Sequence, residues 1–254
     1  MALLEVKNLT KNFGGLTAVG DVSMELKEGE LVGLIGPNGA GKTTLFNLLT
    51  GVYEPTEGTV TLDNTVLNGK TPYKIASLGL SRTFQNIRLF KNMTVLDNVL
   101  IGMDNKHSSH VFASFLRLPK FYSNEKELKT KAMELLAIFH LDGDADVLAK
   151  NLPYGQQRRL EIVRALATEP KILFLDEPAA GMNPQETAEL TALIRQVKEE
   201  FGITIILIEH DMSLVMEVTE RIYVLEYGRL IAHGTPDEIK QNKRVIEAYL
   251  GGEA

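Results

Sequence analysis

The chain has 254 residues, of which 44% are hydrophobic and 24% charged, as in an ordinary globular protein. It contains no cysteine, which excludes disulfides, thiolate metal sites and cysteine nucleophiles. Its 27 basic and 33 acidic residues give a net charge of −6, which argues against a general nucleic-acid coat protein, because no basic excess exists to displace phosphate counterions.

The beginning of the chain gives no sign of export. Residues 1–15 mix Glu5 and Lys7 among their apolar residues and lack the apolar core of a signal peptide. No apolar run in the sequence approaches the ~20 residues that a membrane-spanning helix requires. We therefore expect a soluble, cytosolic protein.

Strand and helix patterns alternate along the chain. Short runs of leucine and β-branched residues predict strands at Leu3–Val6, Leu31–Ile35, Thr59–Leu62, Ile172–Leu175, Ile203–Ile208 and Ile222–Leu225. Three of them (LVGLI, ILFL and ITIILI) are apolar nearly throughout, as in strands buried on both faces of a parallel sheet. Apolar residues recur at helical spacing over 128–139 and 190–201. The alternation predicts an α/β domain.

The stretch from about Gln85 to Leu152 differs from the rest. It has helical patterns, no convincing strand, and a polar opening at Asn105–His110. We interpret it as a helical lobe inserted into the α/β core. Such a lobe would move as a unit, with hinges near its two ends.

A glycine-rich loop follows the LVGLI strand and precedes a helix-compatible run. Residues 36–43 read GPNGAGKT and match the phosphate-binding pattern G-x-x-x-x-G-K-[ST]. Gly39 and Gly41 let the backbone curl so that its N–H groups converge on phosphate oxygens. Lys42 supplies a charge for the β- and γ-phosphates, and the Thr43 hydroxyl can ligate Mg²⁺. The alternative, a glycine-rich turn that happens to contain lysine, fits this strand and helix context poorly.

Two acidic residues, Asp176 and Glu177, follow the strand ILFL directly. Asp176 therefore lies at the carboxyl end of a buried strand, where open α/β sheets place their ligands, and is suited to hold Mg²⁺ through water. Glu177 can polarise the water that attacks the γ-phosphate. Alone, such a pair is usually a solvated strand end. The phosphate loop in the same chain favours the catalytic interpretation.

His210 follows the strand ITIILI after Glu209, so a strand of the same sheet delivers it to the same edge as Asp176. There it could contact the γ-phosphate and hold the attacking water. The alternative is a surface or packing histidine. We interpret the other four histidines as surface or packing residues: His107, His110, His140 and His233.

Together these motifs resemble, over essentially the whole chain, the nucleotide-binding subunit of an ATP-binding cassette (ABC) transporter. The resemblance implies an aromatic at Phe13 that stacks on adenine, and a lid glutamine, Gln85, that touches Mg²⁺ and water. It implies nucleotide contacts at Gly36, Asn38, Gly39, Ala40, Gly41, Lys42, Thr43, Thr44, Tyr154, Gly155 and Gln156. It implies metal contacts at Thr43, Gln85 and Asp176, and catalytic roles for Glu177, His210 and Gln85.

The fold that the resemblance implies is a single P-loop NTPase domain spanning 1–254. Its core, about 1–85 and 156–254, would have a mainly parallel sheet and an antiparallel β subdomain. The inserted helical subdomain would cover about 86–155. The cofactors would be ATP and Mg²⁺.

Two loops depart from the usual family pattern. The signature loop, typically Leu-Ser-Gly-Gly-Gln, reads LPYGQ here, and Pro153 replaces the serine that would contact the partner subunit's γ-phosphate. The loop after Glu177 usually carries an aspartate where this chain has Asn183. At the signature loop, backbone N–H groups and the helix dipole must then contribute more of the phosphate binding. Asn183 can still hydrogen-bond across a dimer but lacks the charge of an aspartate. Neither change deletes a catalytic group, so we expect hydrolysis.

The combination of LPYGQQRRLE, DEPAAGMNP, IEHDM and a C-terminal AYLG resembles the larger of the two ATPase subunits of branched-chain amino acid importers. The segment Asp104–Glu125 fits an extra helical piece of that subfamily, either packed on its own lobe or contacting a partner. The resemblance implies a head-to-tail pair of ATPase subunits with two ATP molecules between them, and the second subunit is either a copy or a different chain.

The other partners implied are membrane-spanning permease subunits and, indirectly, a substrate-binding protein, with no nucleic acid. The chain would be cytoplasmic and peripheral on the inner face of the cell membrane. Three alternatives stay open: the ATPase of a lipid or polysaccharide exporter, a soluble ABC protein acting on ribosomes or DNA, and a nucleotide-binding regulator without turnover. Glu177 counts against the last.

Overall fold

The structure, a computed structural model, describes residues 2–104 and 119–250. Its main sheet has the strand order β10-β9-β3-β8-β7-β6, and every neighbouring pair is parallel except β9–β10. The strands are β3 (Leu31–Ile35), β6 (Leu80–Arg82), β7 (Ile172–Asp176), β8 (Thr204–Ile208), β9 (Arg221–Glu226) and β10 (Arg229–Gly234). Strands β3, β7 and β8 are buried at every position. The predicted α/β class with a mainly parallel sheet is confirmed.

A second, antiparallel sheet has the order β2-β1-β4-β5. Its strands are β1 (Ala2–Phe13), β2 (Leu16–Lys27), β4 (Glu57–Leu62) and β5 (Thr65–Val66). Leu4, Val22 and Val60 of this sheet share one apolar cluster with Phe46 and with Phe174 of β7. The two sheets therefore enclose a common core.

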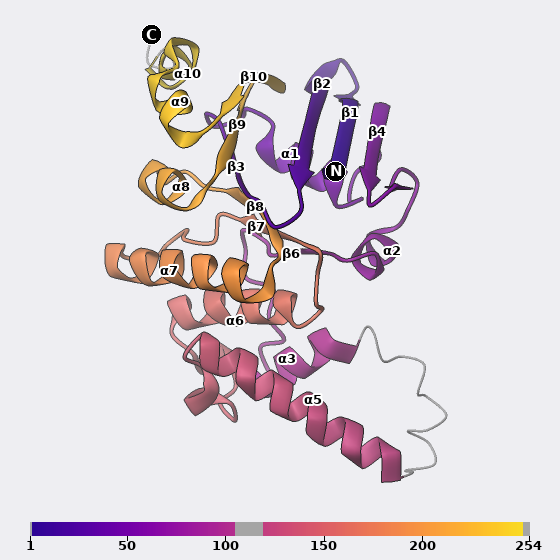
Figure 1. Ribbon diagram of the computed structural model, residues 1–254, viewed down its shortest axis with the longest axis vertical. Helices are drawn as coiled ribbons and strands as arrows, with labels where there is room; N and C mark the ends of the chain where they lie inside the picture. Colours follow the sequence, from indigo (N-terminus) through magenta and orange to yellow (C-terminus); the bar gives the residue numbers. More distant parts are fainter. Residues whose placement is uncertain (1, 105–118, 251–254) are drawn as a thin grey trace.

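The helices are α1 (Lys42–Leu49), α2 (Pro72–Ser77), α3 (Val95–Asp104), α5 (Pro119–Ile138), α6 (Tyr154–Leu166), α7 (Pro184–Phe201), α8 (Met212–Val218), α9 (Pro236–Gln241) and α10 (Lys243–Leu250), with 3-10 turns η2 (Asp142–Asp144) and η3 (Ala149–Asn151). In Figure 1, α7, α6, α3 and α5 follow one another downward from the main sheet. Of the described helices, none combines the length and the apolar character that crossing a membrane demands.

Helix α7 shows how local sequence sets an element. Asn183 and Glu186 form a reciprocal capping box at its start, and Gly202 ends it in the left-handed conformation. Leu190, Leu193, Ile194 and Val197 of the predicted face are buried, whereas Phe201 at the last position is half exposed.

The stretch predicted as a helical lobe contains helices and turns where it is described, apart from an isolated bridge between Thr94 and Leu148. Its apolar residues join those of α6 and α7 in one cluster. The polar opening Asn105–His110, with two of the histidines, and most of the segment Asp104–Glu125 lie outside the described residues. The subdomain boundaries stay a prediction.

Candidate functional site

The phosphate loop connects the end of β3 with the first residue of α1. Gly36 has φ 153°, and a Cβ there would lie 2.1 Å from the carbonyl oxygen of Leu225. Gly41 has φ 99°, and a Cβ there would lie 2.6 Å from the carbonyl oxygen of Ala18. Only glycine fits these two positions, so the motif's glycines follow from the close approach of neighbouring backbone.

Lys42 lies folded against this loop. Its Nζ donates to the carbonyl oxygens of Gly36 at 2.7 Å and Pro37 at 3.1 Å. Burial lowers the pKa of Lys42, while the nearby carboxylates of Glu177 and Asp176 act in the opposite direction. The loop thus holds the Lys42 cation at the start of α1. The positive end of the helix dipole lies there too, so both favour binding of an anion.

The loop forms one wall of an open hollow of about 400 Å³. The predicted residues that line it are Asn38, Gly39, Ala40, Gly41, Lys42, Thr43, Thr44, Gln85, Glu177 and His210. The hollow is also lined by residues that the motifs did not indicate: Leu16, Thr17 and Ala18 of β2 and Tyr227 and Gly228 of the β9–β10 turn. Residues from separate motifs therefore share one concave surface.

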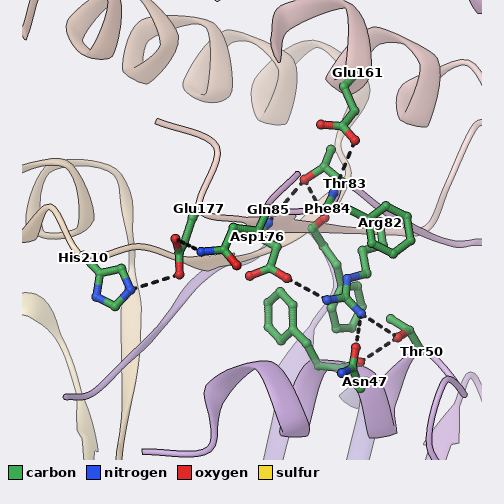
Figure 2. A network of polar contacts seen from close by, with 12 residues as sticks. Asn47, Thr50, Arg82, Thr83, Phe84, Gln85, Glu161, Asp176, Glu177 and His210 are labelled. Carbon is green, nitrogen blue, oxygen red and sulfur yellow. Dashed lines mark hydrogen bonds and ion pairs between the residues drawn. The ribbon is translucent and has the colours of Figure 1, made fainter. Parts of the chain in front are cut away.

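Glu177 is held from two sides, as Figure 2 shows. Gln85 Nε2 donates to Oε2 of Glu177 at 2.8 Å, and His210 Nε2 lies 3.0 Å from Oε1. The Glu177 backbone is left-handed (φ 49°), and its N–H donates to the carbonyl of Ile208 at 2.9 Å. The lid glutamine and the histidine thus meet at one carboxylate beside the phosphate loop.

Asp176 ends β7 and is 2% exposed. Its Oδ2 forms a 2.6 Å ion pair with Nη2 of Arg82, and its N–H donates to Thr83 Oγ1 at 3.3 Å. Arg82 was missed in the sequence analysis. The available signal was an arginine at the end of a short strand, three residues before Gln85.

A second buried pair, Arg158 and Glu161 on α6, forms hydrogen bonds with the backbone of the segment that carries Gln85. Arg158 donates to the carbonyl oxygens of Phe84, at 2.7 Å, and of Gln85. Glu161 Oε1 accepts from the N–H groups of Phe84 at 3.4 Å and Arg88 at 3.2 Å. Burial raises the pKa of Glu161, and these donors oppose the rise. Sequence reasoning missed both residues, because RRLE reads as an exposed charged turn of helix.

Glu209 is a third buried carboxylate that sequence reasoning passed over. It accepts from the N–H of Ala179 at 2.7 Å and of His210 at 3.0 Å. Burial raises its pKa, while these hydrogen bonds lower it. Glu209 thereby joins the loop after Glu177 to the backbone of the histidine.

Phe13 is not among the residues that line the hollow. It is 44% exposed and packs edge-to-face on Tyr53, with ring centroids 5.3 Å apart. Lys11 Nζ lies 5.1 Å from the centroid of the Phe13 ring. The aromatic role implied for Phe13 stays a prediction.

The signature residues lie elsewhere, at the start of α6. The hydroxyl of Tyr154 donates to the carbonyl of Ala180 at 3.0 Å, and Gln156 donates to Asp144 at 3.2 Å. A Cβ on Gly155 would lie 2.9 Å from Oε1 of Glu186. None of the three lines the hollow, so a signature loop that binds nucleotide would have to bind that of another subunit.

The departures from the family pattern have structural uses here. Pro153 is the N-cap residue of α6, and no side chain caps that helix start. The backbone N–H groups there are therefore free for a ligand. Asn183 accepts from the N–H of Glu186 and so caps α7 within its own chain.

The oxygen donors suit Mg²⁺ that arrives with a nucleotide. The Thr43 hydroxyl, the Gln85 amide oxygen and the Asp176 carboxylate are hard ligands, which Mg²⁺ prefers. Among residues 2–104 and 119–250, no cluster of three or more His, Cys, Asp or Glu could hold a metal ion. One carboxylate with phosphate and water ligands is the usual arrangement for Mg²⁺ at such sites, and this donor set fits it.

Sequence comparison gives two family matches. Residues 19–180 match the model described as ABC transporter, and residues 229–254 match that of the branched-chain amino acid ATP-binding cassette transporter. The high-affinity branched-chain amino acid transport ATP-binding protein LivG of Salmonella typhimurium is 51% identical, over 98% of both chains. The corresponding protein BraF of Pseudomonas aeruginosa is 48% identical over the same shares.

Solved structures agree in fold. The ADP conformation of an ATP-binding cassette superposes with a TM-score of 0.84 at 34% identity, covering 99% of both chains. A dimeric post-hydrolysis cassette bound to ADP and phosphate gives a TM-score of 0.76 at 28% identity, covering 92% of this chain and 98% of that one.

Proposed function

The chain belongs to the ATP-binding cassettes of ABC transporters, and from this premise we propose that it is the ATP-hydrolysing subunit of an importer for branched-chain amino acids. The family predicted from the motifs is confirmed. The amino acid specificity is supported by identities near 50% over 98% of the chain and by the C-terminal match over 229–254. The observation that carries hydrolysis is the Glu177 carboxylate held between Gln85 and His210 beside the phosphate loop.

Nucleotide binding rests on the loop and on Lys42. The ammonium group of Lys42 donates to two loop carbonyls, which hold it at the loop and leave the third of its N–H donors for a phosphate oxygen. The loop N–H groups and the start of α1 add further donors. A nucleoside triphosphate is the ligand that fits Lys42, the loop N–H groups and the start of α1, because its phosphates are negatively charged.

Thr43, Gln85 and Asp176 would hold Mg²⁺, which when bound neutralises charge on the phosphates. Glu177 would accept a proton from the attacking water as general base. His210 lies two residues after the end of β8 and contacts the same carboxylate, so it would orient Glu177 toward the water. Gln85 fixes the second carboxylate oxygen and so sets the direction in which the first one points.

A second ATPase subunit would complete the site. The signature residues at the start of α6 lie outside the hollow of their own chain, as a head-to-tail pair requires. The dimeric relative shows that a cassette of this fold pairs. The second subunit is either a second copy of this chain or a different ATPase chain, since both arrangements bring a signature loop to this hollow.

A groove of about 370 Å³ suits a short helix from a membrane subunit. Half-exposed Phe90 and Ile101 lie in it, with Val52 at its rim and Arg164 over the Phe90 ring. The groove borders Arg82 and Phe84, so a helix seated there would press directly on the segment that leads to Gln85. Such a contact would place the chain at the inner face of the cell membrane.

Affinity purification of the tagged chain from detergent-solubilised membranes tests this proposal. We expect mass spectrometry of the captured proteins to identify two multi-spanning subunits and a second small ATPase. A substrate-binding protein for branched-chain amino acids should be captured with them. Capture of the membrane subunits of a lipid or polysaccharide exporter would show that the chain drives export and not import. Ribosomal proteins, or no membrane subunit under conditions that preserve known transporters, would leave only the ATPase.

A further inference from the structure

Arg82 lies at the centre of a buried polar network (Figure 2). Its Nη2 pairs with Asp176 at 2.6 Å, and its Nη1 donates to Asn47 Oδ1 at 2.6 Å and Thr50 Oγ1 at 3.2 Å. Its guanidinium carbon lies 5.0 Å from the ring centroid of Phe84. The planar fork is thus fixed in two directions at once, which a lysine ammonium on a flexible stem does not achieve.

Arg82 and its polar partners lie at the ends of three elements that carry or lead to the proposed Mg²⁺ contacts. Asn47 and Thr50 are at the end of α1, the helix that begins with Lys42 and Thr43. Asp176 ends β7, and Arg82 itself ends β6, three residues before Gln85. A single side chain therefore ties together the helix, the strand and the segment that position those contacts.

The network also has a specific electrostatic consequence. Asp176 is almost fully buried, and a buried carboxylate is costly without a compensating cation. Arg82 supplies that cation through one carboxylate oxygen, Oδ2, and leaves Oδ1 for another ligand. The Nε of Arg82 is buried and has no hydrogen-bond partner. The hydrogen bonds that orient the guanidinium are therefore those of Nη1 and Nη2, to α1 and to Asp176.

We propose that Arg82 is a positioning residue for Mg²⁺: by anchoring Asp176 to α1 it holds the carboxylate in the orientation that receives the ion with its nucleotide. This inference rests on the proposed function. Residues that orient a metal ligand commonly change metal affinity by one to two orders of magnitude when they are replaced.

The test measures the metal directly. Mn²⁺, a paramagnetic substitute for Mg²⁺, is titrated into the full-length protein saturated with a non-hydrolysable ATP analogue, and its binding is followed by electron paramagnetic resonance. Binding of the analogue itself is measured separately in EDTA. The variants are Arg82→Met, Arg82→Lys and Asn47→Ala. Arg221→Met is the matched control, since Arg221 forms a comparable ion pair with Glu30 at 2.7 Å.

For Arg82→Met we expect the Mn²⁺ dissociation constant to rise by about tenfold or more, with analogue binding in EDTA unchanged. Arg82→Lys should recover part of the affinity, because the charge beside Asp176 is kept while the bonds to α1 are lost. Asn47→Ala should give a smaller shift in the same direction. If Arg82→Met does not fold, these two variants carry the comparison.

Wild-type Mn²⁺ affinity in folded Arg82 variants, or an equal shift in Arg221→Met, would overturn the inference and leave Arg82 a packing residue. Failure of the wild-type chain to bind the analogue in EDTA is a different result. It would overturn the proposed function, and this inference with it.

Discussion

The carboxylate of Glu177 and the imidazole of His210 meet at 3.0 Å because the strands that precede them are neighbours in register. Strands β7 and β8 are parallel, and Asp176 is paired with Ile208. Glu177 follows one residue after this pair and His210 two residues after it. The backbone register of two fully buried strands therefore brings these two side chains within reach of each other.

Replacing Glu177 by Gln should abolish turnover while leaving nucleotide binding intact. The amide keeps the shape of the side chain but cannot accept a proton, so steady-state phosphate release should fall by about 10²–10⁴-fold. Affinity for a fluorescent ATP analogue should stay near the wild-type value. Glu217→Gln, at an exposed ion pair on α8, is the control that keeps full activity. Normal turnover by Glu177→Gln would remove Glu177 from its role.

Replacing Lys42 by Ala should weaken nucleotide binding itself. Loss of a charge-assisted hydrogen bond costs about 1.5–3 kcal/mol, so the dissociation constant for ATP should rise by roughly 10–100-fold. The matched control is Lys171→Ala, which removes an exposed lysine paired with Asp63. Unchanged ATP affinity in Lys42→Ala would contradict the phosphate-loop interpretation.

Motifs made of consecutive residues were the part of the site that could be read from the sequence. The phosphate loop lies between one strand and one helix, so its glycines and Lys42 are recognisable without knowledge of the rest of the chain. Buried strands ending in Asp176 and before Glu209 were equally visible as apolar runs. Their parallel pairing then brought Glu177 and His210 together, as the common sheet edge had implied.

The residues that sequence reasoning missed act across large separations. Arg82 contacts Asp176, which is 94 positions away, and Arg158 contacts Phe84, which is 74 positions away. A charged residue reads as exposed unless its partner is known, so pairs of this kind have no local signature. Strand β2 was missed for a different reason: the strands were predicted from runs of leucine and β-branched residues, whereas from Val22 to Lys27 buried and exposed positions alternate, which is the other pattern of a strand, one buried on a single face.

Replacing Glu161 by Gln should destabilise the fold as well as loosen Gln85. The amide leaves Arg158 as a buried cation without its carboxylate, and breaking a buried pair on one side costs about 3 kcal/mol. The free energy of unfolding is measured by urea titration, with phosphate release recorded on the same preparation. Glu189→Gln breaks a more exposed pair with Arg159, whose charges water already screens, and should cost much less. Equal losses in the two variants would show that burial of the Arg158–Glu161 pair has no energetic weight.

Glu209 gives the fold a pH dependence whose sign is fixed by burial. Burial raises the pKa of Glu209 above the ordinary carboxyl value of 4.5, so the folded chain keeps its proton where the unfolded chain has lost it. Stability from this group is therefore complete below that ordinary value and declines as pH rises through the raised pKa.

Glu209→Gln removes this titration while keeping a side chain of the same size. We expect the stability of the wild type relative to the variant to decrease as pH rises from 4 upward, measured by urea unfolding at each pH. Glu189→Gln is the control of opposite sign, because hydrogen bonds from Gln185 and Arg159 lower the pKa of Glu189. The free energy of unfolding of the wild type relative to Glu189→Gln should therefore decrease as pH falls. If the difference between wild type and Glu209→Gln stays constant with pH, the hydrogen bonds from Ala179 and His210 balance the burial of this carboxylate, and if it grows with pH they outweigh it. Either outcome would contradict the prediction.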